Sequence, residues 1–330
     1  MPPSLELLPF SPAEFEAGSR PDMVAALNAA VAAGSTEFIA FVAHAAAAPA
    51  SAFQSAVAVL EQAPGAAAVV AVPEPNPPDP GLRLIDEHSP AAAFLISPAW
   101  SLRVLFRRDR FNALGGLRPV EFPLWDWLIR AALSSERVRY HEGLFPNSPA
   151  MKAELHALTP ARPPVRRTWL LEHLHHFEAA GLAVANDETA GTALMAGLYQ
   201  WCDFLEESHE RSQRIEGQGA GLPGDCWHAI MHRREPDYAN ARYWFRRVGR
   251  QAMFSDLQAC AAAILQATGA ITAEAWRARL SRGGWDPLAF VDLCEACATP
   301  GHELETAARR IQRCEMTLLL NATFAIAMRR

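Results

Sequence analysis

The hydrophobic pattern of this chain changes at one Pro-rich segment, residues 146–165, and this change limits the folds that the chain can adopt. Before the segment, short continuous apolar runs alternate with stretches of helical periodicity. After it, apolar residues recur at helical spacing only. A Pro-rich, aperiodic stretch is typical of a domain connection. We therefore expect an α/β domain over residues 1–148, followed by an all-α domain over residues 149–330.

The first half of the chain alternates between helix-like and strand-like segments. The expected elements, in chain order, are a helix at 22–34, a strand at 37–43, a helix at 49–63, strands at 67–72, 94–96 and 102–106, and a helix at 125–133. The strand segments are short continuous apolar runs, which is the pattern of strands buried on both faces. The sequence therefore predicts a mainly parallel sheet with helices packed against it.

Several segments of the first half follow one another in a recognisable order. A helix that carries Asn28 and ends at Gly34 leads into the strand Phe38-Ile-Ala-Phe-Val42. Phe106-Arg-Arg-Asp109 and Leu114-Gly-Gly-Leu117 come later, followed by the helix Leu124-Trp-Asp-Trp-Leu-Ile-Arg-Ala131. Over about residues 20–145 the chain thus resembles the family 2 glycosyltransferases of the GT-A fold. The resemblance implies transfer or recognition of a sugar or nucleotide sugar, with Asp126 as an acidic catalytic residue.

The chain departs from that family where the metal-binding residues should lie. The family places an Asp-x-Asp motif after the strand, because a divalent cation must bridge protein oxygens and the diphosphate leaving group. This chain has Ala43-His-Ala-Ala46 there, and Ala cannot bind a metal. The family's catalytic base would fall near Pro123 or Leu124, and Glu121 and Asp126 are the acids close by. We therefore expect a truncated, degenerate GT-A-like domain, and whether it is an enzyme stays open.

The densest group of polar side chains lies in the second half, at Asp225–Gly249 (DCWHAIMHRREPDYANARYWFRRVG). Asp225 is expected to cap a helix that ends near Glu235, because Pro236 lacks an N–H and crowds the preceding turn. Asp237 should cap a second helix, and Gly249 should end it. The segment is therefore predicted to be a helical hairpin.

Both helices of this hairpin are expected to present a polar face. His228, His232 and Glu235 recur at i, i+4 and i+7 on the first helix, and Asn240 and Trp244 share a face of the second with Arg247. If the hairpin folds on itself, the two faces line one pocket. The candidate catalytic residues are therefore Asp126, His228, His232 and Glu235, and the candidate ligand-binding residues are His209, Arg233, Asn240, Trp244 and Arg247.

Three interpretations of the hairpin stay open. In the first, it binds a sugar or a phosphorylated small molecule, with Arg side chains for charge and aromatic rings for stacking. The second is a metal-dependent enzyme centred on His228 and His232, with His209 or Glu207 as the third ligand. The third is a scaffold held by acid–Arg pairs. The leading interpretation assigns no metal ligand, and the sequence names no cofactor.

Composition limits the partners and the cellular compartment. With a net charge of −6, the chain is not expected to bind nucleic acid. The N-terminal MPPSLELLPF lacks the basic and apolar regions of a signal peptide, and no apolar run is long enough to span a membrane. Six Cys, including Cys294-x-x-Cys297 without a second pair at zinc spacing, suit reduced thiols. A cytoplasmic protein is therefore expected, and the sequence does not indicate its oligomeric state.

Overall fold

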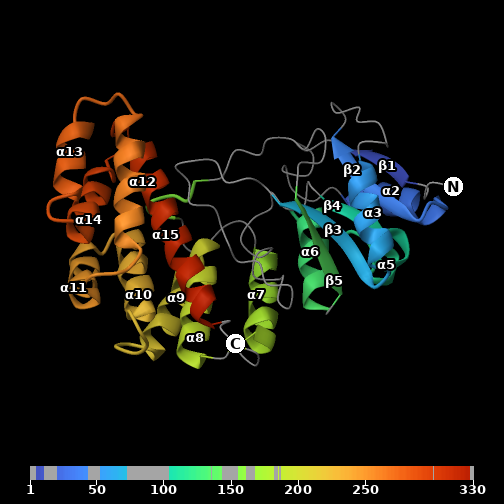
Figure 1. The fold of residues 1–330 in the computed structure, drawn as a ribbon, viewed down its shortest axis with the longest axis horizontal. Helices are drawn as coiled ribbons and strands as arrows, with labels where there is room; N and C mark the ends of the chain where they lie inside the picture. The colour runs from blue at the N-terminus through green and yellow to red at the C-terminus, as the bar shows by residue number, and fades with distance from the viewer. Residues whose placement is uncertain are drawn as a thin grey trace. The chain divides into compact units, whose positions relative to one another are not determined.

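The described part of the chain forms two compact units, one that contains a β-sheet and one built from helices (Figure 1). The computed structural model describes residues 5–10, 21–43, 53–72, 104–134, 136–142, 155–160, 168–181, 185, 187–299 and 301–327. The expected boundary between residues 148 and 149 lies outside these ranges, as does the strand expected at 94–96.

The first unit holds a five-stranded sheet of order β1-β2-β4-β3-β5. Its elements are β1 (Leu5–Phe10), α2 (Pro21–Ala33), β2 (Phe38–Ala43), α3 (Gln54–Gln62), β3 (Ala66–Val72), β4 (Val104–Arg107), α5 (Arg108–Ala113), α6 (Pro123–Leu133) and β5 (Arg137–Glu142). Three of these elements, β1, α5 and β5, were not predicted from the sequence pattern. The α/β class is confirmed, since strands and helices alternate along this unit.

The expectation of a mainly parallel sheet is wrong, because the sheet is mixed. β1 pairs with β2 and β3 with β5 in parallel, whereas β4 runs antiparallel to both β2 and β3. All four residues of β4 are buried. A strand buried on both faces has the same continuous apolar sequence in either direction, so its hydrophobic pattern does not report how it runs.

Helices cover both faces of this sheet, because successive strand residues point to opposite sides. On one side, α3 packs on β3, β4 and β5 through a cluster that contains Phe38, Leu60 and Leu105. On the other side, Phe106 meets Phe111 of α5 and Trp127 of α6, with the Phe106 and Trp127 ring centroids 4.8 Å apart. The unit is therefore layered as helix, sheet, helix.

The second unit contains only helices among its described elements. They are α7 (Thr168–Gly181), α8 (Glu188–Trp201), α9 (Leu205–Arg214), α10 (Pro223–Arg234), α11 (Tyr238–Val248), α12 (Phe254–Gln266), α13 (Ala273–Leu280), α14 (Pro287–Ala296) and α15 (Glu305–Ala327). The chain turns between α8 and α9, where Asp203 adopts φ 68°.

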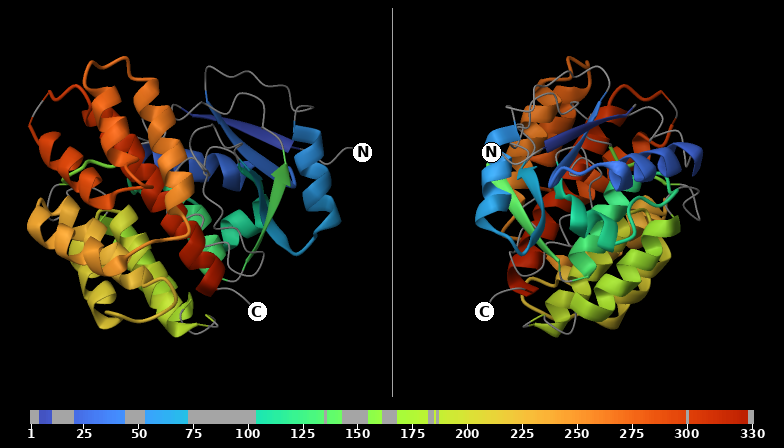
Figure 2. Two further views of the ribbon diagram at one scale, coloured as in Figure 1. Left: turned by 60° about the vertical axis from the view of Figure 1, so that its left-hand side comes forward. Right: turned by 90° about the vertical axis from the view of Figure 1, so that its right-hand side faces the viewer.

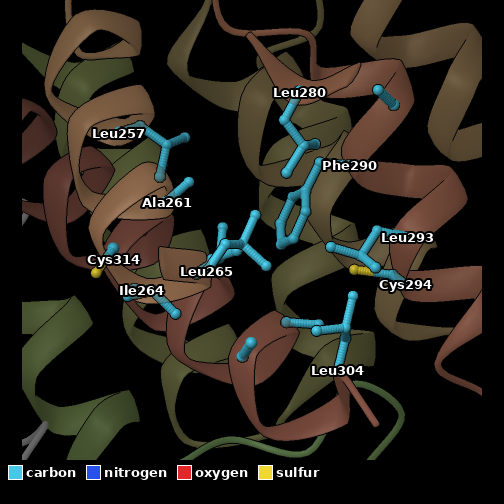
Figure 3. Packing of buried hydrophobic residues seen from close by; sticks show 14 of the residues in the cluster. Leu257, Ala261, Ile264, Leu265, Leu280, Phe290, Leu293, Cys294, Leu304 and Cys314 are labelled. Carbon is cyan, nitrogen blue, oxygen red and sulfur yellow. The ribbon is translucent and has the colours of Figure 1, made fainter. Parts of the chain in front are cut away.

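One apolar core of this unit lies between α12, α13, α14 and α15, and Figure 3 shows its packing. Phe290 lies at its centre, with Leu265, Leu280 and Leu293 around it. Cys294 belongs to the same core, and burial raises the pKa of its thiol to about 12. A buried, protonated thiol of this kind is a packing residue rather than a nucleophile.

Helix α15 connects this core to the rest of the unit. It packs along α12 and α8, as the two views of Figure 2 also show. No helix in the described part of the chain is long and apolar enough to cross a membrane. The six cysteines are all free thiols.

Candidate metal centre

Helix α10 carries the densest group of polar residues, and it is surrounded by other helices. It packs against α8, α9 and α11, and all 12 of its residues are buried. The expected polar face therefore lies inside the helical unit. Helical periodicity shows which residues share a face, but it does not show which other helices will cover that face.

The two ends of the predicted hairpin lie close to where the sequence placed them. α10 ends at Arg234 before Pro236, and the Asp237 side chain accepts the backbone N–H of Asn240 at 3.1 Å as the N-cap of α11. Gly249 ends α11 with φ 66°. The start differs from the prediction. Asp225 is not the cap but lies in the first turn, where its Oδ1 accepts the N–H of Gly217 at 2.9 Å.

Three histidines converge where α9 meets α10. A ring nitrogen from each of His209, His228 and His232 lies within 4.8 Å of the other two. The ring centroid of His209 lies 4.7 Å from that of His228 and 5.5 Å from that of His232. The rings of His228 and His232 stack at 4.8 Å with 19° between their planes. His209, and not Glu207, thus joins the two histidines of the hairpin.

His228 is the most enclosed member of the cluster. Its residue is 2% exposed, and neither Nδ1 nor Nε2 has a hydrogen-bond partner among the described residues. Burial, together with the neighbouring His232, His209 and Arg247, lowers its pKa to about 3. The ring is therefore neutral near pH 7, and at least one of its nitrogens offers a lone pair.

His232 lies beside the carboxylate of Glu235, the residue that follows the last residue of α10. Its Nδ1 lies 3.2 Å from Oε2 of Glu235, and the Glu235 side chain is 22% exposed. A carboxylate beside one ring nitrogen favours a proton on that nitrogen, which directs the lone pair of Nε2 elsewhere. Glu235 is thus placed to orient the ring of His232 rather than to join the group of three histidines.

Trp244 of α11 joins the cluster to an arginine. Its indole stacks on His228 with ring centroids 4.0 Å apart, and Cζ of Arg247 lies 4.8 Å from the indole centroid. Arg247 Nη1 lies 2.9 Å from a carboxylate oxygen of Glu216, and Nε lies 3.8 Å from Oδ2 of Asp225. Of the candidate residues, Trp244 therefore lies beside the histidines, and Arg247 lies beside Trp244.

The other candidate residues of the hairpin lie elsewhere. Arg233 is 1% exposed and forms an ion pair with Glu315 of α15, so it cannot flank a pocket as expected. Asn240 is exposed, and its side-chain N–H group donates to Asp237 at 2.7 Å. The expectation that Asn240 shares a site with Trp244 is therefore not supported, because its side chain serves the cap of α11.

Asp126 belongs to the first unit, and its surroundings favour a structural role. It is 1% exposed and accepts hydrogen bonds from Arg118 at 2.8 Å and from Arg130 at 2.8 Å. Arg130 also donates to the carbonyl oxygens of Leu114 and Gly116. Both oxygens of the carboxylate are therefore engaged in structural contacts.

The sequence analysis missed the acid that anchors α10. Glu315 is completely buried in α15 and binds Arg233, and Phe290 lies against the same guanidinium, 4.5 Å from Cζ to ring centroid. A usable signal did exist, since Glu315 is the one acid in the mostly apolar sequence from residue 311 to residue 328.

Comparison with known proteins found no matching family model, no matching curated protein and no matching solved structure. The site is therefore interpreted from its own geometry. Imidazole nitrogen is a common ligand for zinc and other divalent transition metals, and three histidines with an open fourth position form one of the known catalytic zinc arrangements. The arrangement can hold such an ion between α9 and α10.

Proposed function

We propose that the helical unit binds a divalent transition-metal ion, with zinc the first candidate, through His209, His228 and His232. The observation that carries this proposal is the convergence of three imidazoles within 4.8 Å of one another, two of them buried. A buried polar group without a partner costs free energy, and both nitrogens of His228 lack one among the described residues. A metal ion would supply that partner.

The side chains need only small adjustments to bind an ion. Zn–N bonds of about 2.0–2.1 Å in a tetrahedral site require nitrogens about 3.3–3.4 Å apart. Since the present nitrogens lie within 4.8 Å of one another, they must approach by up to about 1.5 Å. The stacked rings of His228 and His232 must also rotate to face one ion. Rotation about the last side-chain torsion of His is soft, and His209, which is only partly buried, has room to adjust.

The two flanking contacts suit a metal site. Glu235 beside Nδ1 of His232 forms the carboxylate–histidine arrangement that commonly orients a metal ligand. Trp244 limits the orientations of the His228 ring by stacking on it. Both neighbours thus restrict a ring without occupying the nitrogen that the metal needs.

The test is metal content. The full chain, purified without an affinity tag or chelator, is analysed by plasma mass spectrometry for zinc, manganese, iron, cobalt and nickel. We expect close to one transition-metal ion per chain, or uptake of one zinc ion on dialysis. His209→Ala and the double variant His228→Ala/His232→Ala should lose the metal, whereas His176→Ala, an exposed histidine of α7, should keep it. A metal-free chain that takes up no zinc would overturn the proposal.

We also propose, for the first unit, a glycosyltransferase-like function with the GT-A fold, either sugar transfer or recognition of a nucleotide sugar. The segments that carry the resemblance are joined in space, which supports this second proposal. The Asn28 side chain donates to the carbonyl oxygen of Leu117 at 2.9 Å and accepts the Leu117 N–H at 2.8 Å. Arg118 and Arg130 in turn hold Asp126 of the following helix.

The second proposal is tested with a panel of nucleotide sugars. A transferase predicts release of nucleoside diphosphate, and a recognition unit predicts binding without release. Asp126→Asn should lower the stability of the first unit in either case, because it removes a buried charge from two arginines. If the intact chain neither turns over nor binds any nucleotide sugar of the panel, this function is excluded.

A further inference from the structure

Helix α9 contributes little apolar surface to the helical unit. Of its 10 residues, Leu205, Ser208 and Ser212 are buried, and two of these are small and polar. The free energy gained by packing grows with the apolar area that is removed from water, so α9 packs more weakly than a helix with a continuous apolar face. Contacts of other kinds therefore matter for the position of α9.

Polar contacts fix α9 to the helices that precede it. The side chain of Gln200 in α8 donates to Oγ of Ser208 at 3.1 Å. Arg211 donates to the carboxylate of Glu178 in α7 at 2.9 Å. These contacts hold α9 toward α7 and α8, and the contacts toward α10 are of a different kind.

Two places on α9 meet α10. Ile215, the residue that follows α9, lies so close to Gly224 near the start of α10 that a Cβ at Gly224 would come within 2.6 Å of it. Further along α10, the ring of His209 lies against His228 and His232, with ring centroids 4.7 and 5.5 Å away. His209 thus links α9 to a part of α10 that lies away from the connecting segment.

The segment that connects α9 to α10 is costly to order. Residues 216–221 are exposed. Gly217, Gly219 and Gly221 all have positive φ, and Leu222 adopts φ 48°. Gly loses the most backbone freedom when a loop becomes ordered, and a non-Gly residue in the left-handed region adds strain. Because α9 runs directly into this segment, the two form a unit that can open before the rest of the domain does.

We infer that the metal ion fastens α9 to α10 and so controls the opening of residues 205–222. The inference rests on the proposed metal-binding function and assigns the ion a conformational role. An ion held by His209 from one helix and by His228 and His232 from the other cross-links the two helices, and its binding free energy then stabilises their contact. The apolar core between α12, α13, α14 and α15 contains none of the three ligands.

The linkage between binding and opening gives the size of the effect. An ion that needs all three histidines binds the closed form and not the open one, so it lowers the open population by a factor of 1 + [L]/Kd. Free zinc at ten times its Kd should therefore slow exchange through the open form about tenfold, and zinc at a hundred times its Kd about a hundredfold.

The experiment is hydrogen exchange, followed peptide by peptide by mass spectrometry, on the full chain at increasing free zinc. We expect the amides of α9 and of residues 216–222 to slow by the factors above, and the amides of α12 and α14 to stay unchanged. The α12 and α14 amides also report that the rest of the helical unit remains folded, so the titration of the natural chain does not depend on any variant.

Two variants locate the link on α9. His209→Ala should abolish the response of residues 205–222 to zinc, because α9 then has no ligand for the ion. Gln213→Ala, which alters an exposed side chain one helical turn away, should respond as the natural chain does. A His209→Ala variant that responds to zinc as Gln213→Ala does would overturn the inference.

The remaining outcomes separate this inference from the metal proposal. If a chain with a full complement of zinc exchanges at α9 as fast as the zinc-depleted chain, the ion does not fasten α9 and the metal site stands. The same holds if zinc slows exchange equally in α9, α12 and α14, since the effect is then not local. A chain that takes up no zinc would overturn both proposals, and metal content alone shows which case holds.

Discussion

The indole of Trp244 stacks on the imidazole of His228, with ring centroids 4.0 Å apart and 21° between the planes. Trp244 lies on α11 and His228 on the adjacent helix α10. The guanidinium of Arg247 also packs on the Trp244 indole. Because neither ring nitrogen of His228 has a hydrogen-bond partner among the described residues, packing rather than hydrogen bonding holds this ring. A flat neighbour therefore sets the orientation of a proposed metal ligand.

Substitution of Trp244 tests that relationship. Trp244→Ala removes the stacking surface and should weaken zinc affinity, together with a loss of about 3–5 kcal/mol of stability for a large core truncation. Trp244→Phe keeps an aromatic plane against His228 and should retain most of the affinity. Competition with a zinc-binding dye measures both variants, with circular dichroism to follow folding. Equal zinc affinity in the Ala and Phe variants would show that the stack does not position the ligand.

Glu235 is predicted to support the metal through His232. Because its carboxylate lies 3.2 Å from Nδ1 of that ring, Glu235→Ala should lower zinc affinity by about 10–100-fold, the usual cost of losing such a partner. Glu274→Ala, an exposed acid of α13, serves as the control and should leave the affinity unchanged. The measurement is the same dye competition. An unchanged affinity in Glu235→Ala would mean that the carboxylate plays no part in the site.

The buried pair of Arg233 and Glu315 is predicted to join α10 to α15. Glu315→Gln leaves a buried guanidinium without its charge partner and should cost about 3–5 kcal/mol, measured by urea unfolding of the helical unit. The double variant Arg233→Met/Glu315→Leu removes both charges and should be less destabilised than the single variant. If Arg233→Met/Glu315→Leu is instead less stable than Glu315→Gln, the unpaired buried charge is not the main source of the loss.

Acid should weaken the contact between α7 and the helices that follow it. Burial opposes ionisation of Glu178, but hydrogen bonds from Arg211 at 2.9 Å and Tyr199 at 2.8 Å outweigh it and hold the pKa of Glu178 below its ordinary value. The folded state therefore prefers the ionised carboxylate. The stabilisation is fully present above the unfolded pKa of about 4.3 and is lost as the pH falls through the lower folded value.

Glu178→Gln tests that pH dependence. At pH 7 the variant should be less stable than the natural chain by about 1.5–3 kcal/mol, the usual contribution of hydrogen bonds to a charged group. The difference should shrink below pH about 4 as the natural carboxylate becomes protonated. Urea unfolding across this pH range measures it. A difference that stays constant with pH would show that the charge of Glu178 does not stabilise the fold.

Local chemistry predicted the helical hairpin well. Pro236 ends α10, Asp237 caps α11 and Gly249 ends it, because each of these effects acts within one turn of the chain. The convergence of His228 and His232 follows from their spacing of one helical turn. His209 could be named only as a candidate, since its place beside them depends on how α9 packs against α10.

The sequence by itself determined the class of each half, with strand-like runs before the Pro-rich segment and helical spacing after it. Tertiary structure decided three other features: the direction of β4, the burial of α10, and the role of its arginines. Arg233 was expected at a ligand and instead pairs with Glu315, which lies 82 positions further along the chain. The physical reason is the same in each case. Residue spacing determines what shares a strand or helix face, whereas the partner of that face is set by packing between segments far apart in sequence.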